Sequence, residues 1–164
     1  MNPFSTHLVL LNKLFDQFTP SSIFEYGMGL YSTPFFLEKA DEVISVEMQY
    51  QDWYDRINEE FADDKFTCVC KLGPTEAIDY FESLDRDFDM VFVDGVTRWL
   101  CINKAFSKTK VIVTHDTEHT SPTYGWDRVD VPEDWVTFTD AVRNPYTTIY
   151  YHNSLNLDFS DLVL

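Results

Sequence analysis

Short apolar runs of strand length alternate with segments of helical spacing along the first two thirds of the chain. The runs are rich in Val, Ile, Phe and Cys and do not alternate with polar residues, which is typical of strands covered on both faces. The five runs lie at residues 23–26, 43–46, 66–70, 90–93 and 111–113. They predict the strands of one sheet with two buried faces.

Helical spacing separates these runs, because apolar residues recur there three or four positions apart and so share one helix face. The positions are Leu11, Leu14, Phe15 and Phe18 before the first run, Trp53, Ile57 and Phe61 after the second, and Ala77, Ile78, Phe81 and Leu84 after the third. Ser32 or Thr33 ahead of Pro34 predicts another helix start, since a hydroxyl can cap free amides and proline fits the first turn. Repeated β-α units predict an α/β, Rossmann-like, doubly wound and mostly parallel sheet with helices on both faces.

The pattern changes in the last third of the chain. Prolines at 122 and 132 and Gly125 predict a long loop over residues 117–133. A short helix is predicted over 134–142, a strand over 146–151 and a further strand over 158–163. The 164 residues fit one domain. We divide it into a leading helix (1–20), a β-α core (21–116), the long loop (117–133), and a terminal helix with a β-rich tail (134–164).

The charge of the chain narrows its partners. Lys and Arg total 12 against 28 Asp and Glu, a net charge of −16, which repels phosphate backbones and anionic bilayers. We therefore expect no nucleic acid and no membrane partner. No apolar run approaches the roughly 18–20 residues of a membrane span, and no basic, apolar signal segment opens the chain. A soluble, cytoplasmic protein is the expectation.

A glycine pair directly follows the first predicted strand in the stretch IFEYGMGLYST, residues 23–33. Gly27 and Gly29 allow a sharp turn and a close ligand approach, because no Cβ blocks the path. The helix that follows points free amides into the same space. Glu47 ends the second strand, where an acid can accept hydrogen bonds from a ribose. Together these features predict a nucleotide-like ligand and make 21–116 the cofactor-binding core.

The acid ahead of the glycines separates two nucleotide-binding patterns. The dinucleotide pattern G-x-G-x-x-G has Ser32 in place of its third glycine, whereas Glu25-Tyr-Gly27-Met-Gly29 resembles the E-x-G-x-G motif of class I S-adenosylmethionine-dependent methyltransferases. Three further stretches match that family in order: Glu47, FDMVFVDG at 88–95 and VIVTHD at 111–116. The β-rich tail resembles the antiparallel strands that close the family's sheet.

The resemblance implies a cofactor, S-adenosylmethionine, and roles for individual residues. Glu25, Gly27 and Gly29 would hold its methionine part and backbone, Glu47 its ribose, and Asp94 would lie beside it at the end of the fourth strand. The V-D-G ending of that strand is similar to small-molecule O-methyltransferases. This implies O-methylation of a hydroxyl on a small molecule or sugar.

The chemistry directs attention to Asp94, His115 and Asp116 as candidate catalytic residues, because an alcohol acceptor must lose its proton near the donor. One interpretation is a divalent metal site, for magnesium or manganese, built from Asp94 and Asp116 with His115 or Glu118. A second makes His115 or His119 a metal-free general base. In a third, Asp116 caps a turn, Glu118 is solvated and His115 is a core residue.

Two other functions compete with the enzyme. The chain is short for the fold, and its loop at 71–74 lacks the acid or amide with which the family reads adenine, so a non-catalytic module that binds a nucleotide or a partner is an alternative. An NAD-dependent oxidoreductase is disfavoured by Ser32 and by the lack of a substrate domain. A homo-oligomer that completes the acceptor site is compatible with the small domain.

Overall fold

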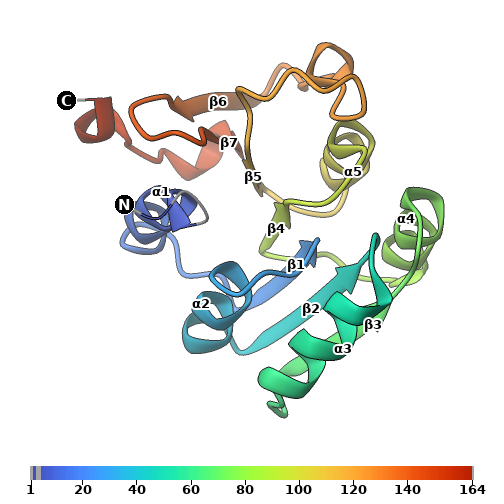
Figure 1. Ribbon diagram of the computed structural model, residues 1–164. Helices are drawn as coiled ribbons and strands as arrows, with labels where there is room; N and C mark the ends of the chain where they lie inside the picture. The colour runs from blue at the N-terminus through green and yellow to red at the C-terminus, as the bar shows by residue number, and fades with distance from the viewer. Residues whose placement is uncertain (1, 3–4, 164) are drawn as a thin grey trace.

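A seven-stranded mixed sheet forms the centre of the computed structural model, which describes residues 2 and 5–163 (Figure 1). Its order is β3-β2-β1-β4-β5-β7-β6. The strands are β1 Ser22–Tyr26, β2 Glu42–Glu47, β3 Phe66–Cys70, β4 Met90–Val93, β5 Val111–His115, β6 Trp135–Asp140 and β7 Thr147–His152. The first five are parallel, and β7 runs antiparallel to both β5 and β6. The predicted fold class is confirmed.

Five α-helices flank the sheet in the described part of the chain (Figure 1). They are α1 His7–Phe15, α2 Ser32–Lys39, α3 Gln51–Glu60, α4 Pro74–Ser83 and α5 Arg98–Ala105. Buried side chains of α1 and α2 join one hydrophobic cluster, and those of α4 and α5 join another. Because neighbouring residues of a strand point to opposite faces, Phe92 of β4 enters the first cluster and Val91 enters the second.

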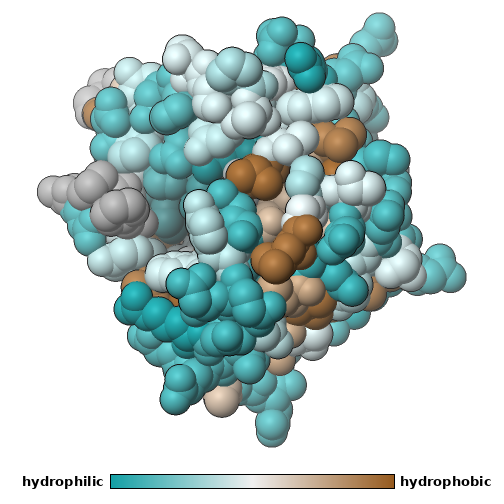
Figure 2. All heavy atoms as spheres, turned by 45° about the vertical axis from the view of Figure 1, so that its right-hand side comes forward, coloured by the Kyte–Doolittle hydropathy of each residue, from teal (hydrophilic) through white to brown (hydrophobic). Residues whose placement is uncertain are grey.

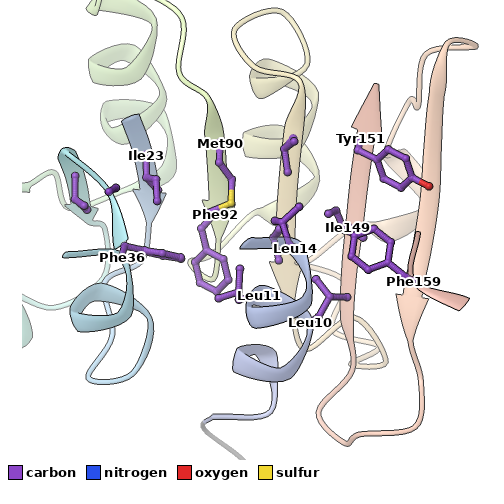
Figure 3. Packing of buried hydrophobic residues seen from close by; sticks show 14 of the residues in the cluster. Leu10, Leu11, Leu14, Ile23, Phe36, Met90, Phe92, Ile149, Tyr151 and Phe159 are labelled. Atoms are coloured by element: carbon purple, nitrogen blue, oxygen red, sulfur yellow. The ribbon is translucent and has the colours of Figure 1, made fainter. Parts of the chain in front are cut away.

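The first cluster fixes the N-terminal helix over the sheet. Leu10, Leu11 and Leu14 of α1 are fully buried and lie between Phe92 of β4 and Ile149 of β7 (Figure 3). Burying a leucine side chain contributes about 1.5–3 kcal/mol, so these three leucines anchor α1 firmly. The first residue of α1 is thereby held above the carboxyl ends of β4 and β5.

Two predicted elements near the C-terminus were wrong. The predicted helix at 134–142 is instead the strand β6, Trp135–Asp140, which pairs in register with β7 along its whole length. Trp135 and Phe138 have helical spacing, but the intervening valine and threonine favour a strand. Residues 158–163 do not form a strand either. They end in the 3-10 helix Ser160–Val163, and Phe159 and Leu162 pack into the first cluster.

The surface is mostly polar. Figure 2 shows a hydrophilic face on which apolar side chains gather in small patches near the middle. Large exposed apolar side chains among the described residues are few: Tyr31, Tyr50, Leu72, Val136 and Val142. In this part of the chain, every helix is too short or too polar to cross a lipid bilayer.

Candidate functional site

The carboxyl ends of four adjacent strands, β2, β1, β4 and β5, bring the predicted site residues to one edge of the sheet. Two cavities of about 420 and 370 Å³ open there and share Met28, Trp53 and Asp94. The larger cavity, on the β4–β5 side, is also lined by His7, Gly29, Leu30, Tyr31, Ser32, His115, Asp116 and Pro145. The smaller, on the β1–β2 side, is also lined by Gly27, Glu47, Gln49, Tyr50 and Asp52. We call them the β4 cavity and the β2 cavity.

Gly27 makes the turn that follows β1 and lines the β2 cavity. Its φ is +80°, and a Cβ added there would lie 2.7 Å from the amide nitrogen of Gly95 and 2.8 Å from the carbonyl of Asp94. Its own amide donates to the carbonyl of Val46 at 2.9 Å. Only glycine fits this position, so the turn holds β1, β2 and β4 together whether or not a ligand is bound.

Glu25 lies beneath this turn and is fully buried. Its carboxylate accepts hydrogen bonds from Ser32 (2.5 Å), Thr33 (2.8 Å) and Ser45 (2.5 Å). The expected cap by Ser32 or Thr33 is therefore wrong, because both hydroxyls bind Glu25 instead of the free amides of α2. Thr33 Oγ1 also accepts from the amide of Gly29 at 3.0 Å, so the network connects Glu25 to the glycine turn. Glu25 is not among the residues that line either cavity.

Glu25 predicts a pH dependence of stability. Burial raises its pKa from 4.5 to about 7, against the lowering effect of the three hydroxyls. Its folded pKa lies above its unfolded pKa, so its contribution is complete below pH 4.5 and is lost as pH rises to about 7. Glu25→Gln has no carboxyl to titrate and does not show this loss. Its unfolding free energy minus that of wild type should therefore rise by about 3 kcal/mol as pH rises from 4.5 to about 7.

Urea unfolding of both proteins at several pH values measures this difference, with exposed Glu59→Gln as the control. A Glu25→Gln difference that stays constant from pH 4.5 to 7.5 would show that the carboxyl is ionised throughout.

Glu47 borders the β2 cavity and is held by its own loop. Its Oε1 accepts from the amides of Gln49 (2.7 Å) and Tyr50 (3.0 Å). Burial raises the pKa of Glu47, and these backbone amides partly offset the rise. An ionised carboxylate has roughly four acceptor positions, so two amides leave capacity for hydroxyl groups of a ligand.

Arg98 connects the acids at the ends of β4 and β5. Its Nη2 donates to Asp94 at 2.8 Å and to Asp116 at 3.1 Å, while its Nε and Nη1 donate to the carbonyls of Gly95 and His115. Its guanidinium also lies 4.1 Å from the centre of the Tyr124 ring. Burial favours a neutral Asp94, but Arg98 and His115 outweigh it and the pKa of Asp94 lies below its usual value. Arg98 therefore forms ion pairs with both acids.

His115 has both ring nitrogens engaged. Nε2 lies 2.9 Å from the hydroxyl of Thr6, which donates to the carbonyl of Pro145 at 2.8 Å. Since a carbonyl only accepts, the Thr6 proton goes to Pro145 and Nε2 of His115 is the donor. Nδ1 then faces the carboxylates, 3.7 Å from Asp94 Oδ2 and 3.5 Å from Asp116 Oδ1. Nδ1 and the two carboxylates therefore form one polar cluster at the ends of β4 and β5.

The three side chains form a candidate site for a divalent cation. Nδ1 of His115 and one oxygen each of Asp94 and Asp116 lie within 4.8 Å of one another. The other oxygen of each acid is held by Arg98, and Thr6 orients the imidazole, as outer partners do around metal sites. Carboxylate oxygens suit magnesium or manganese.

Comparisons with solved structures identify the fold. An O-methyltransferase from Bacillus cereus, solved with SAH, superposes with a TM-score of 0.72 at 15% identity over 90% of this chain and 81% of that chain. The O-methyltransferase TomG from Streptomyces achromogenes, solved with SAM, gives 0.62 at 18% identity over 89% and 78%. The N-methyltransferase NodS from Bradyrhizobium japonicum gives 0.61 at 13% identity over 92% and 97%. This is the fold of the class I S-adenosylmethionine-dependent methyltransferases. No family model and no curated protein matches the sequence.

Within this methyltransferase fold, sequence reasoning missed His7. The side chain lines the β4 cavity and is only 2% exposed. A lone histidine ahead of a leucine-rich helix has no local signal of a site. The available clue was its place at the first turn of a leading helix that had to pack across the sheet.

Two other candidates lie outside the cavities of the methyltransferase fold. Glu118 is half-buried, accepts from the amide of Tyr146 at 2.7 Å and lines neither cavity. His119 is exposed, and its Nδ1 accepts from the amide of Ser121 at 3.1 Å. Asp116 adopts a positive φ of 57° and pairs with Arg98 rather than capping a turn. Of the predicted catalytic residues, Asp94, His115 and Asp116 are brought together.

Proposed function

We propose that the chain is an S-adenosylmethionine-dependent methyltransferase that methylates a hydroxyl of a small molecule. The observation that carries the proposal is a pair of cavities that share Asp94 at the carboxyl edge of a methyltransferase fold. One is bordered by a glycine turn and an acid, and the other by the acids and histidine of β4 and β5. A donor and an acceptor bound in them would meet at Asp94.

The β2 cavity suits the donor nucleoside. Glu47 offers a carboxylate already oriented by loop amides, which can accept from the hydroxyls of a ribose. Trp53, whose indole donates to the carbonyl of Met28 at 2.8 Å, stands between the two cavities. Gly29 and the start of α2 continue the surface into the β4 cavity, beside the methionine end of the donor.

The β4 cavity suits the acceptor. When bound, the cofactor would supply the methyl group to the acceptor oxygen and keep the S–C electron pair on its sulfur, while Nδ1 of His115 would take up the hydroxyl proton. Asp94, Asp116 and His115 orient groups in this cavity and keep its field negative beside the positive donor. Because such a displacement gains mostly from alignment, rigid packing of these residues is their main contribution.

Magnesium or manganese would be held by Asp94, Asp116 and His115, where it would acidify the acceptor hydroxyl. In a metal-free enzyme, Nδ1 of His115 would act as the general base instead. Binding of Mn²⁺, followed by its paramagnetic resonance and compared with Asp116→Asn, distinguishes the two. Binding of Mn²⁺ to wild type that Asp116→Asn weakens supports the metal, and no binding of Mn²⁺ to wild type supports the metal-free base.

The test of the enzyme is turnover of S-adenosylmethionine with a panel of phenols, alcohols, sugars and amines, with and without magnesium. We expect acceptor-dependent release of S-adenosylhomocysteine, which Asp94→Asn lowers by roughly 100-fold or more. Exposed Asp55→Asn is the matched control and should keep full activity. Binding of S-adenosylhomocysteine without turnover of any acceptor would favour the non-catalytic module. Turnover of amines alone would show that the methyl acceptor is an amine and not a hydroxyl.

A further inference from the structure

His7 is a buried imidazole without a hydrogen-bond partner among the described residues. Neither of its ring nitrogens has a hydrogen bond, although the side chain is only 2% exposed. Buried polar groups are nearly always satisfied, so each exception calls for an explanation. Three side chains among residues 2 and 5–163 have such buried, unsatisfied atoms, and of these only His7 lines the β4 cavity; the other two are Tyr26 and Thr147.

The position of His7 assigns it to the acceptor side. Its ring packs edge-on against His115 with centroids 4.7 Å apart and lies 5.5 Å from Phe92 of β4. It therefore stands over β4 and β5, whereas Glu47 of the proposed nucleoside site is on β2. Thr6, its neighbour, binds His115 and Pro145, so the start of α1 is fixed at this wall.

The β4 cavity favours an uncharged acceptor. The cavity contains the polar residues His7, Ser32 and His115 and the acidic centre of Asp94 and Asp116. Its other walls are Met28, Gly29, Leu30, Tyr31, Trp53 and Pro145. No lysine or arginine is among the lining residues that the structure describes, and Asp94 and Asp116 give the cavity a negative field. An anionic acceptor therefore finds no basic side chain among these lining residues, and flat apolar walls suit an aromatic ring.

We propose that His7 binds the methyl acceptor, a small uncharged phenol, through a hydrogen bond from the phenolic hydroxyl to one of its ring nitrogens. This rests on the proposed function, because it places the acceptor beside the donor site. The unsatisfied nitrogens are the cost of a binding site that is complete only with the acceptor present. His7 is an acceptor-binding residue, separate from the acidic centre of Asp94 and Asp116.

The test uses catechol as the probe and three proteins, wild type, His7→Phe and His7→Gln. Phenylalanine keeps the shape of the ring and removes both nitrogens, while the glutamine amide can still accept a hydrogen bond. Each protein is titrated with S-adenosylhomocysteine and then, at saturation, with catechol. We expect His7→Phe to keep its affinity for S-adenosylhomocysteine within about twofold and to bind catechol at least about tenfold more weakly. His7→Gln should recover part of the loss.

Thermal unfolding separates binding from a structural role. Since His7→Phe removes two unsatisfied polar atoms, its Tm should rise by a few degrees, whereas a structural histidine would lower it. Equal loss of both ligands in His7→Phe would assign His7 to the donor site and overturn the proposal, as would unchanged catechol binding. If wild type saturated with S-adenosylhomocysteine does not bind catechol, the proposed phenolic acceptor is wrong. The protein could also bind catechol through His7 but fail to bind S-adenosylhomocysteine. That result would support the role of His7 and contradict the proposed methyltransferase.

Discussion

Replacing Arg98 by methionine is expected to cost the folded protein about 3–5 kcal/mol, because removing one partner of a buried ion pair leaves an uncompensated charge. The Arg98 side chain is 3% exposed. Its guanidinium is shared by Asp94, Asp116 and two backbone carbonyls. Methionine fills much of the same volume but donates no hydrogen bond, so both carboxylates would face each other without a cation.

Urea unfolding at pH 7 measures this loss, and Arg56→Met is the control, because it removes an exposed pair with Glu60 at 3.8 Å and a contact with the Trp53 ring at 5.3 Å. The loss should also depend on pH. Because the folded pKa of Asp94 lies below 3.8, the stability from this pairing is present above pH 3.8 and is lost as pH falls below it. The gap between Arg98→Met and wild type should narrow in acid. A variant as stable as the control at pH 7 would contradict the shared-cation role of Arg98.

Gly27→Ala is expected to destabilise the protein by about 2–5 kcal/mol. A positive φ costs a residue with a side chain about 1–2 kcal/mol, and overpacking against fixed atoms adds about 1–3 kcal/mol. Both apply here, since the φ is +80° and the new Cβ would lie within 2.8 Å of backbone atoms of Asp94 and Gly95. Backbone of two paired strands cannot move aside as a flexible side chain can, so the turn itself must distort.

Gly73→Ala is the matched control, because its φ is +132° but nothing lies within 4 Å of the added Cβ. Thermal unfolding of both variants separates the two contributions. Gly73→Ala should show the backbone strain alone, and Gly27→Ala should melt several degrees lower. Equal melting temperatures would mean that the turn after β1 relaxes easily. Any loss of ligand binding in a Gly27 variant must therefore be read against its folded fraction.

The β-α core was predictable because its signals are local. Both-face burial produces apolar runs, and the turn at Gly27 requires glycine for steric reasons that the residue type reveals. The C-terminal part was harder. A half-exposed edge strand such as β6 presents Trp135 and Phe138 at helical spacing, and only its pairing with β7 decides its form.

The site was predictable in its strand-end residues and not in its long-range partners. Asp94, His115 and Asp116 follow from the strand ends, since neighbouring parallel strands finish at one edge. The contact of Thr6 with His115 spans 109 positions. No pattern in the sequence around Thr6 and His7 indicates that these residues lie beside the strand ends. The role of Glu25 was also hidden, because an acid before a glycine turn looks the same whether it binds a ligand or three hydroxyls.

Calorimetric titration of the wild-type protein with S-adenosylhomocysteine, beside NAD, tests most directly whether the two cavities form a methyl-donor site. We expect one-to-one binding of S-adenosylhomocysteine with a Kd on the order of micromolar and no heat from NAD. No binding of S-adenosylhomocysteine, or binding of NAD alone, would contradict the proposed methyltransferase.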